Sequence, residues 1–523
     1  MFETAELGHR VSAADFRERA SQLRQRLLDV QSRLRAADFP VVVLFAGVDG
    51  AGKGATVNLL CEWMDPRGIV TRAYAPPSDE ERERPEFWRY WRDLPPAGQI
   101  GIFLSAWYSQ PLVARAYGDI THAGLDERLD EIIAFERMLA TGGAVFVKLW
   151  MHLGKRAQKK RLKALEADKA ERWRVTDLDW KHWRLYDKFV AASERVVMRT
   201  STGLAPWTIV DGQDARYRSL KAGTLLYDEI ERKLGQAAVR SMPPSAAAES
   251  AADDDESGGV TGAAASADPE PLETRTILDR LDLGLALNKA AYTKRLRQGH
   301  ARLNLLHREA RQRQLSTILV FEGWDAAGKG GAIRRLTPAL DARAYDIITI
   351  AAPTDEERVH HYLWRFWRHI PRAGRVTFFD RSWYGRVLVE RVERFAADAE
   401  WRRAYAEINS FEQQLVEHGI VLIKFWLHIS NDEQERRFQA REEVPYKRWK
   451  LTEEDWRNRD KWHAYERAVH DMIERTSTRI APWVLVEGND KRHARVKVLE
   501  QVAHVWERTL RKPPTADAIA RDS

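Results

Sequence analysis

The sequence of 523 residues contains one unit twice, at a fixed spacing. The segment FAGVDGAGKG begins at Phe45, the segment FEGWDAAGKG begins at Phe321, and 321 − 45 = 276. The same offset, with no gap, pairs 14 of the 20 tryptophans: Trp88 with Trp364, Trp91 with Trp367, Trp107 with Trp383, Trp150 with Trp426, Trp173 with Trp449, Trp180 with Trp456 and Trp207 with Trp483. The chain therefore consists of two copies, at about 12–235 and 288–511, called here the first and the second repeat. A period this long indicates a fused pair of domains rather than a solenoid.

The segment between the repeats, 236–274, has a different composition. It includes SMPPSAAAESAADDDESGGVTGAAASADPEP and contains almost no large apolar side chains. Such a segment cannot bury enough surface to offset the entropy of ordering it. We therefore expect a first domain at 1–235, a flexible linker at 236–274 and a second domain at 275–523.

Composition excludes several classes of protein. With 44% apolar residues the chain is not wholly disordered, and a single cysteine, Cys61, allows neither an internal disulfide nor a Cys-rich zinc site. No apolar run approaches the roughly 20 residues of a membrane span, and the N-terminal segment does not resemble a signal peptide. We therefore expect a cytoplasmic protein without membrane contact. The net charge of +7 favours an anionic partner, but no nucleic-acid-binding module is apparent, so we expect no nucleic acid.

Each repeat opens with a charged segment of helical character, at about 12–36 and 288–313, and then alternates short apolar runs with helix-length segments. The runs are 41–45, 69–74, 99–104, 144–150 and 208–210 in the first repeat and 316–321, 346–350, 376–379, 420–427 and 483–486 in the second. Short β-branched and aromatic runs separated by helix-length segments predict a parallel sheet with crossover helices. The expected fold class is α/β, with about five strands in each repeat.

A phosphate-binding loop is predicted directly after the first strand of each repeat. Residues 323–329 of the second repeat fit G-x-x-x-x-G-K, in which backbone N–H groups and a lysine surround phosphate oxygens. The candidate phosphate-binding residues are Gly323, Ala326, Ala327, Gly328, Lys329 and Gly330. A plain Gly-rich turn is the alternative, which the preceding strand and the repetition disfavour. Because Gly330 replaces the usual Ser/Thr ligand of Mg²⁺, Asp325 becomes the candidate metal ligand.

A second acidic position follows the third strand of the second repeat. Asp380 ends that strand, beside the predicted loop, and Arg381 and Arg386 could neutralise phosphoryl charge. An N-cap Asp with a surface ion pair is the alternative. The first repeat has Leu104, Ser105 and Gln110 at these three positions but keeps Lys53 and the neighbouring Trp-Tyr pair. We therefore expect the first repeat to fold and to be catalytically degenerate.

A basic segment follows the fourth strand of the second repeat. Its members are Arg436, Arg437, Arg441, Lys447, Arg448, Lys450, Arg457, Arg459 and Lys461. In an isolated helix these residues would indicate a solvated face, but in P-loop kinases this place holds a lid that closes over phosphates. Arg441, Lys447, Arg448 and Lys450 are the candidate lid residues.

Together these motifs resemble the type-2 polyphosphate kinase family in its two-domain form. The resemblance rests on 322–330, 379–386, 447–452 and 481–483 and covers both repeats. It implies tandem P-loop domains of the thymidylate-kinase-like fold with a helical lid. It also implies transfer of the terminal phosphoryl group of inorganic polyphosphate to a nucleotide, with Mg²⁺. The two-domain form implies AMP as acceptor, ADP as product and catalysis in the second repeat.

The resemblance also assigns roles to single residues. Asp325 and Asp380 match the metal-site carboxylates, whereas Lys329, Arg381 and Arg386 match the phosphate-binding cations. A further residue, Glu390, lies near positions associated with nucleotide selection, and the first repeat has Ala114 there.

Two other functions stay open from the residues alone: an ATP-dependent P-loop nucleotide or small-molecule kinase, and a non-catalytic polyanion-binding protein. The rich basic segment and the unusual loop favour polyphosphate over ATP, and the complete set of charged residues in the second repeat favours turnover. The first repeat is expected to be structural or to anchor the polymer. A homo-oligomer is a further expectation by analogy.

Overall fold

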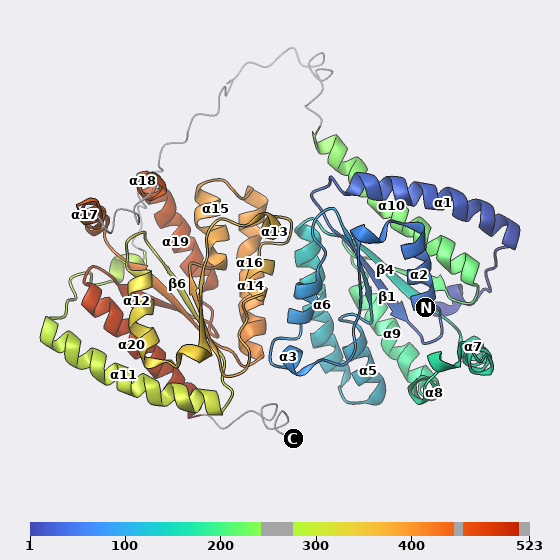
Figure 1. The fold of residues 1–523 in the computed structure, drawn as a ribbon, viewed down its shortest axis with the longest axis horizontal. Coiled ribbons are helices and arrows are strands. Elements are labelled where there is room, and N and C mark those ends of the chain that lie inside the picture. Colours follow the sequence, from blue (N-terminus) through green and yellow to red (C-terminus); the bar gives the residue numbers. More distant parts are fainter. Residues whose placement is uncertain (242–275, 444–452, 512–523) are drawn as a thin grey trace, which may run out of the picture. The chain divides into compact units, whose positions relative to one another are not determined.

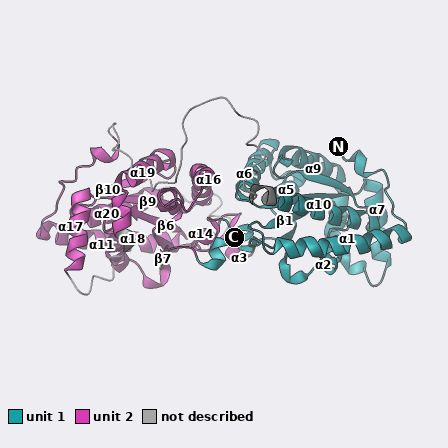
Figure 2. Ribbon diagram, turned by 90° about the horizontal axis from the view of Figure 1, so that it is seen from above, with its two compact units in different colours: residues 1–77, 89–257, 354–361 teal, residues 78–88, 258–353, 362–523 magenta. Residues whose placement is uncertain are grey.

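The computed structural model describes residues 1–241, 276–443 and 453–511 (Figure 1). They belong to two compact units (Figure 2). One unit comprises Met1–Pro77, Arg89–Ser257 and Thr354–His361, and the other comprises Ser78–Trp88, Gly258–Pro353 and Tyr362–Ser523. Most of the predicted linker, 236–274, lies outside the described residues, but 236–241 continue a helix that begins at Ala215.

The helices of both repeats alternate with strands, as the run lengths predict. In the first half of the chain they are α1 (Ala13–Leu34), α2 (Lys53–Trp63), α3 (Asp79–Arg82), α4 (Trp88–Asp93), α5 (Ser109–Tyr117), α6 (His122–Thr141), α7 (Lys155–Ala167), α8 (Asp177–Arg184), α9 (Tyr186–Thr200) and α10 (Ala215–Ser241). In the second half they are α11 (Lys289–Gln312), α12 (Lys329–Leu336), α13 (Asp355–Arg358), α14 (Trp364–Trp367), α15 (Val389–Val392), α16 (Asp398–Glu417), α17 (Asn431–Glu442), α18 (Glu453–Asp460), α19 (Trp462–Thr476) and α20 (Lys491–Leu510).

Each repeat contains one sheet of five parallel strands, which confirms the predicted α/β class. The strands are β1 (Val41–Gly47), β2 (Ile69–Ala73), β3 (Ile100–Leu104), β4 (Val145–His152) and β5 (Trp207–Asp211), then β6 (Thr317–Gly323), β7 (Tyr345–Thr349), β8 (Val376–Asp380), β9 (Val421–His428) and β10 (Trp483–Glu487). The order is β2-β3-β1-β4-β5 in the first sheet and β7-β8-β6-β9-β10 in the second. Each strand differs from its predicted run by only a residue or two at the ends.

The strand order places the predicted motifs together. In the second sheet β6 is central, with β8 on one side and β9 on the other. The connection from β6 leads toward β7 at one edge of the sheet, and the connection from the neighbouring strand β9 leads the opposite way, to β10. Ligands of open α/β sheets bind at such a point. The loop 323–329 follows β6, and Phe321 pairs in register with Asp380 at the end of β8. The phosphate loop and the strand-end carboxylate therefore share one edge of the sheet.

A buried charge pair supports the Trp-Tyr segment in both repeats. In the second repeat Glu412 accepts hydrogen bonds from Trp383 (3.1 Å), Tyr384 (2.6 Å) and Lys424 (2.7 Å). Lys424 also donates to the carbonyl of Thr476 at 2.8 Å. The first repeat reproduces every contact with Trp107, Tyr108, Glu136, Lys148 and Thr200. Because a buried charge needs such partners, this network explains why both repeats keep the Trp-Tyr segment.

The part of the chain that the structure describes contains no helix both long enough and apolar enough to cross a bilayer.

Candidate active site

The loop after β6 has the backbone geometry that its sequence predicts. Gly323 adopts φ 150°, and a Cβ there would lie 2.5 Å from the carbonyl oxygen of Leu427, so only glycine fits. Ala326 holds φ 62°, a left-handed conformation that costs a non-glycine residue about 1 kcal/mol. The ammonium of Lys329, at the start of α12, donates to the carbonyls of Gly323 (2.7 Å) and Trp324 (3.3 Å). The lysine charge therefore lies against the loop.

Asp325 is the one carboxylate of the loop 323–329, and each of its oxygens accepts a hydrogen bond. Its Oδ1 accepts from Arg381 at 2.9 Å, and its Oδ2 accepts from Asn458 of α18 at 3.0 Å. Burial alone raises the pKa of Asp325, but Lys329, Arg381 and the Asn458 hydrogen bond outweigh it and hold the pKa below its ordinary value. Asp325 is therefore ionised at neutral pH.

Asp380 lies beside the first turn of α12. Its Oδ2 is 3.7 Å from the position that a Cβ would take at Gly330. The glycine that replaces the usual Ser/Thr of a P-loop thus leaves room next to the strand-end carboxylate. The structure brings together four of the predicted site residues: Asp325 and Lys329 from the loop and the first residue of α12, and Asp380 and Arg381 from the end of β8.

A third carboxyl group, Glu322, belongs to the same cluster and was not predicted as a site residue. Ser382 donates to its Oε1 at 2.7 Å. Burial raises the pKa of Glu322, and the Ser382 hydrogen bond, Lys329 and Arg381 offset this only in part. The first repeat has Ala46 and Ala106 in place of Glu322 and Ser382, a difference that the repeat offset could have revealed.

Arg381 and Arg386 occupy different surroundings. Arg381 has φ 63°, and Ser105 at the equivalent position has φ 52°. Both repeats therefore keep a left-handed backbone conformation directly after this strand. Arg386 forms an ion pair with Glu390 at 3.1 Å and lies 4.5 Å from the ring centroid of Tyr362. Burial raises the pKa of Glu390, with Arg386 as the largest opposing influence. The structure thus joins Arg386 to the predicted nucleotide-selecting residue, Glu390.

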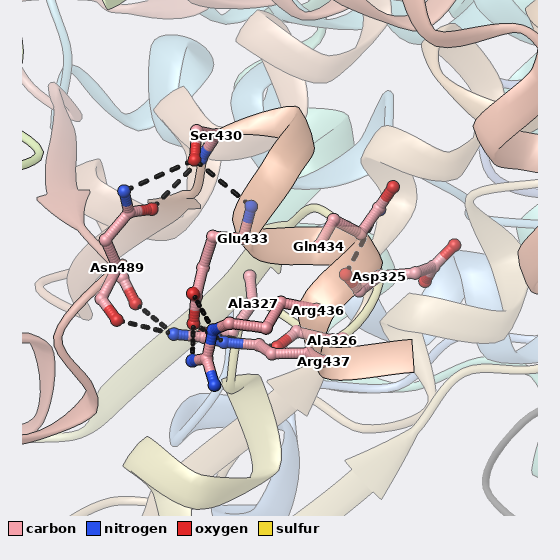
Figure 3. Close-up of polar contacts among 10 residues, drawn as sticks. Asp325, Ala326, Ala327, Ser430, Glu433, Gln434, Arg436, Arg437 and Asn489 are labelled. Atoms are coloured by element: carbon pink, nitrogen blue, oxygen red, sulfur yellow. Dashed lines mark hydrogen bonds and ion pairs between the residues drawn. The ribbon is translucent and has the colours of Figure 1, made fainter. Parts of the chain in front are cut away.

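Arg437 of α17 connects the phosphate loop to the turn after β10 (Figure 3). Its Nη1 donates to the carbonyls of Ala326 (2.9 Å) and Ala327 (3.0 Å), and its Nη2 donates to those of Gly488 (2.6 Å) and Asn489 (2.9 Å). The side chain is only 3% exposed, and Glu433 balances its charge. One guanidinium therefore holds two loops in a fixed relation, and we call this set of contacts the Arg437 clamp.

The predicted lid is described only in part. Lys447, Arg448 and Lys450 lie outside the described residues, whereas Arg441 lies in the last turn of α17. The helices on either side of 444–452 both contact Asp325, because Gln434 of α17 donates to its carbonyl at 3.2 Å and Asn458 of α18 donates to its carboxylate. The bases of the predicted lid are therefore attached to the phosphate loop.

The first repeat keeps the loop but changes the groups around it. Lys53 again donates to its own loop, at 2.6 Å to the carbonyl of Gly47. Asp49 is held by His182, at the position of Asn458, with 2.7 Å between Oδ2 and Nδ1. Burial raises the pKa of Asp49, but His182 and Lys53 outweigh it and lower the pKa overall. Without equivalents of Asp380 and Arg381, the first repeat has a phosphate loop and few of the other charged groups.

A parallel sheet with a G-x-x-x-x-G-K loop after its central strand, and with carboxylates and arginines at the adjacent strand end, defines a P-loop phosphotransferase fold. The chain belongs to the polyphosphate kinase 2 (PPK2) family, which it matches over residues 10–238 and 286–513. The predicted tandem arrangement of two such domains is thereby confirmed.

Relatives cover almost the whole chain. Over 513 residues it is 52% identical to the polyphosphate:AMP phosphotransferase of Pseudomonas aeruginosa, with 98% of this chain and 100% of the relative covered. It is 48% identical to the protein of the same name from Pseudomonas syringae pv. tomato, with 98% and 99% covered. A crystal structure from Pseudomonas aeruginosa assigned to polyphosphate kinase 2 superposes with a TM-score of 0.85 at 50% identity, with 98% and 100% covered.

Proposed function

We propose that this chain transfers the terminal phosphoryl group of inorganic polyphosphate to AMP, forming ADP, and that the second repeat does so. The observation that carries the proposal is the cluster of Asp325, Lys329, Asp380 and Arg381 around a phosphate loop without Ser/Thr, a cluster that the first repeat lacks. Two relatives that each cover 98% of the chain carry the name of this activity, which supports the proposal.

The chemistry requires alignment and charge neutralisation more than proton transfer. An oxygen of the AMP phosphate forms a bond to the terminal phosphorus, and the bond from that phosphorus to the bridging oxygen of the polymer breaks. The shortened polyphosphate leaves with the electron pair. Because the attacking phosphate is already an oxyanion, no general base is required. Lys329, Arg381 and Arg386 are proposed to neutralise the phosphoryl oxygens that would otherwise repel each other.

Asp325 and Asp380 are the proposed ligands of Mg²⁺. Carboxylate oxygens are the ligands that Mg²⁺ prefers. Asp325 is ionised, and within the described ranges the Asp380 carboxylate accepts no hydrogen bond, so the donor set fits the ion. When bound there, Mg²⁺ would supply additional positive charge to the phosphoryl oxygens.

Other residues are proposed to select and enclose the substrates. Glu390 shares an ion pair with Arg386, which connects the proposed nucleotide-selecting residue to a proposed phosphate-binding one. Arg441 and the segment that contains Lys447, Arg448 and Lys450 are proposed to close over the phosphates. The first repeat is proposed to be structural or to anchor the polymer through Lys53.

The donor and the acceptor can be tested in one assay. The full-length protein is incubated with Mg²⁺ and AMP, and either polyphosphate or ATP is added before the nucleotides are separated. We expect ADP to form with polyphosphate and not with ATP. ADP formed only with ATP would identify an ATP-dependent kinase. No product with either donor would exclude both enzyme functions and leave a polyanion-binding protein.

A further inference from the structure

Trp324, inside the phosphate loop, is held by residues of two other elements. It is buried, and its ring stacks on that of Trp462, the first residue of α19, with 3.8 Å between the ring centroids and 9° between the planes. Its Nε1 donates to Nδ1 of His428, the last residue of β9, at 3.2 Å. One side chain of the loop is therefore attached both to a strand end and to a helix.

His428 is a neutral acceptor between two indoles. The Nε1 of Trp426 donates to the same Nδ1 atom at 3.3 Å. Burial lowers the pKa of His428 to about 4, against the opposing charge of Asp279. Because an indole N–H can only donate, Nδ1 accepts and the proton of the neutral ring lies on Nε2. Hydrogen bonding as well as stacking therefore sets the orientation of the Trp324 ring.

The next residue of the loop, Asp325, is held at the same junction of α18 and α19. Asn458 donates to its Oδ2 at 3.0 Å, and Tyr465 donates to the Oδ1 of Asn458 at 3.1 Å, which fixes the direction of the amide. Trp462 lies between these two residues in the sequence. Two successive loop residues thus contact this junction, Trp324 through its ring and Asp325 through its carboxylate.

The first repeat keeps part of this cluster but not the contact. At the fixed offset Trp324, Trp426, His428 and Trp462 correspond to Val48, Trp150, His152 and Tyr186. Within the described ranges, neither the Nε1 of Trp150 nor the Nδ1 of His152 has a hydrogen-bond partner. Tyr186 donates instead to the carbonyl of Leu153 at 2.9 Å. The repeat without an equivalent of Asp380 therefore also lacks the aromatic attachment of its phosphate loop.

We propose that Trp324 is a positioning residue: held by Trp462 and His428, it fixes the phosphate loop against α18 and α19 and so keeps the Asp325 carboxylate in place as a metal ligand. The inference rests on the proposed function, since it takes Asp325 as a ligand of Mg²⁺. It accounts for a large aromatic residue in a loop, 323–329, whose other members are glycine, alanine or charged. Groups behind a metal ligand commonly orient it in this way.

The first test is Trp324→Val in the full-length chain, which places the residue of the first repeat in the second. We expect the Mg²⁺ concentration for half-maximal ADP formation to rise about tenfold and kcat to fall about tenfold, the lower end of what groups that orient a metal ligand contribute. The KM for AMP is expected to stay unchanged. Trp324→Phe keeps a ring that can stack, so both changes are expected to stay below about threefold.

The second test measures the loop without metal or substrate. Amide hydrogen exchange in 323–329 is expected to be about tenfold faster in Trp324→Val, while exchange in α16 is unchanged. The matched control is Trp506→Val, which removes another buried indole, one that donates to Thr317 at the start of β6 at 3.0 Å. This control is expected to lower the melting temperature but to leave both the loop exchange and the Mg²⁺ dependence as in the wild type.

Trp462→Tyr removes the other ring of the stack and is expected to give the same changes, which the double variant Trp324→Val/Trp462→Tyr does not increase. If Trp324→Val does not fold, Trp462→Tyr is judged by the same measurements. Unchanged loop exchange and Mg²⁺ dependence in a folded variant, equal changes in Trp506→Val, or additive effects in the double variant would overturn the positioning role. A wild-type protein that forms no ADP from polyphosphate would instead refute the proposed function, and the exchange measurement, which needs no turnover, would still decide whether Trp324 fixes the loop.

Discussion

The variant Asp380→Asn is expected to lose turnover by about a thousandfold or more, whereas Asp49→Asn in the first repeat keeps most of it. Asparagine retains the size of Asp380 but removes the charge that we assign to the metal site. Two polyanions must meet beside Lys329 and Arg381. Without the Asp380 carboxylate the site would hold Mg²⁺ less tightly, so less positive charge would lie between the two polyanions. Asp49 is paired with His182 in a repeat that has Leu104 where the second repeat has Asp380.

Both variants are measured as initial rates of ADP formation from AMP and polyphosphate at saturating Mg²⁺. Thermal unfolding of each full-length variant shows whether its fold is retained. Dependence of the Asp380→Asn rate on a higher Mg²⁺ concentration would agree with a weakened metal site. Equal losses in the two variants would contradict the division of labour between the repeats, and an active Asp380→Asn variant would remove Asp380 from the mechanism.

The fold could be predicted because the sequence contains two copies of one domain that can be compared with each other. Apolar runs in two copies at one offset give two independent predictions for each strand, and β6 and β8 were placed to within two residues. The same comparison separates Trp383 and Tyr384, which both repeats keep around Glu412, from Asp380, which only one repeat has. Packing residues resist substitution in any copy that folds, whereas catalytic residues are free to change in a copy that does not catalyse.

The side-chain network of the site could be predicted only in part. The P-loop motif determines its own backbone, so Lys329 and Asp325 follow from local sequence. The partners of Asp325 come from far along the chain, and nothing local in the sequence shows that Asn458 reaches its carboxylate. Arg437 is one of many cations in its segment, and charge alone does not separate a buried clamp from a solvated face. Comparison of the two repeats at the fixed offset does distinguish Arg437, because its partner Glu433 is replaced by Ala157 in the first repeat.

The second large effect is expected at this clamp. Arg437→Met removes the donors of four hydrogen bonds to loop carbonyls. Because the side chain is buried and paired with Glu433, its removal is expected to cost about 3 kcal/mol of stability in the second repeat. We expect kcat to fall about a hundredfold, since a small displacement of the phosphate loop misaligns the donor with AMP. The KM for AMP is expected to change little.

The variant Arg437→Lys separates geometry from charge. Lysine restores the positive charge but cannot donate from two nitrogens in opposite directions, so most of the loss in kcat is expected to persist.

The matched control is Arg161→Met, at the equivalent position of the first repeat. There the carbonyl of Gly212, which corresponds to Gly488, is bonded by Arg218 of α10 at 3.0 Å, and Arg161 makes no hydrogen bond within the described ranges. Full activity of Arg437→Lys would mean that the clamp acts through charge, and a loss equal to the unfolded fraction would mean that it acts through stability alone. A reduced kcat in fully folded Arg437→Lys, with Arg161→Met unaffected, is the result that identifies Arg437 as a residue that positions the phosphate loop.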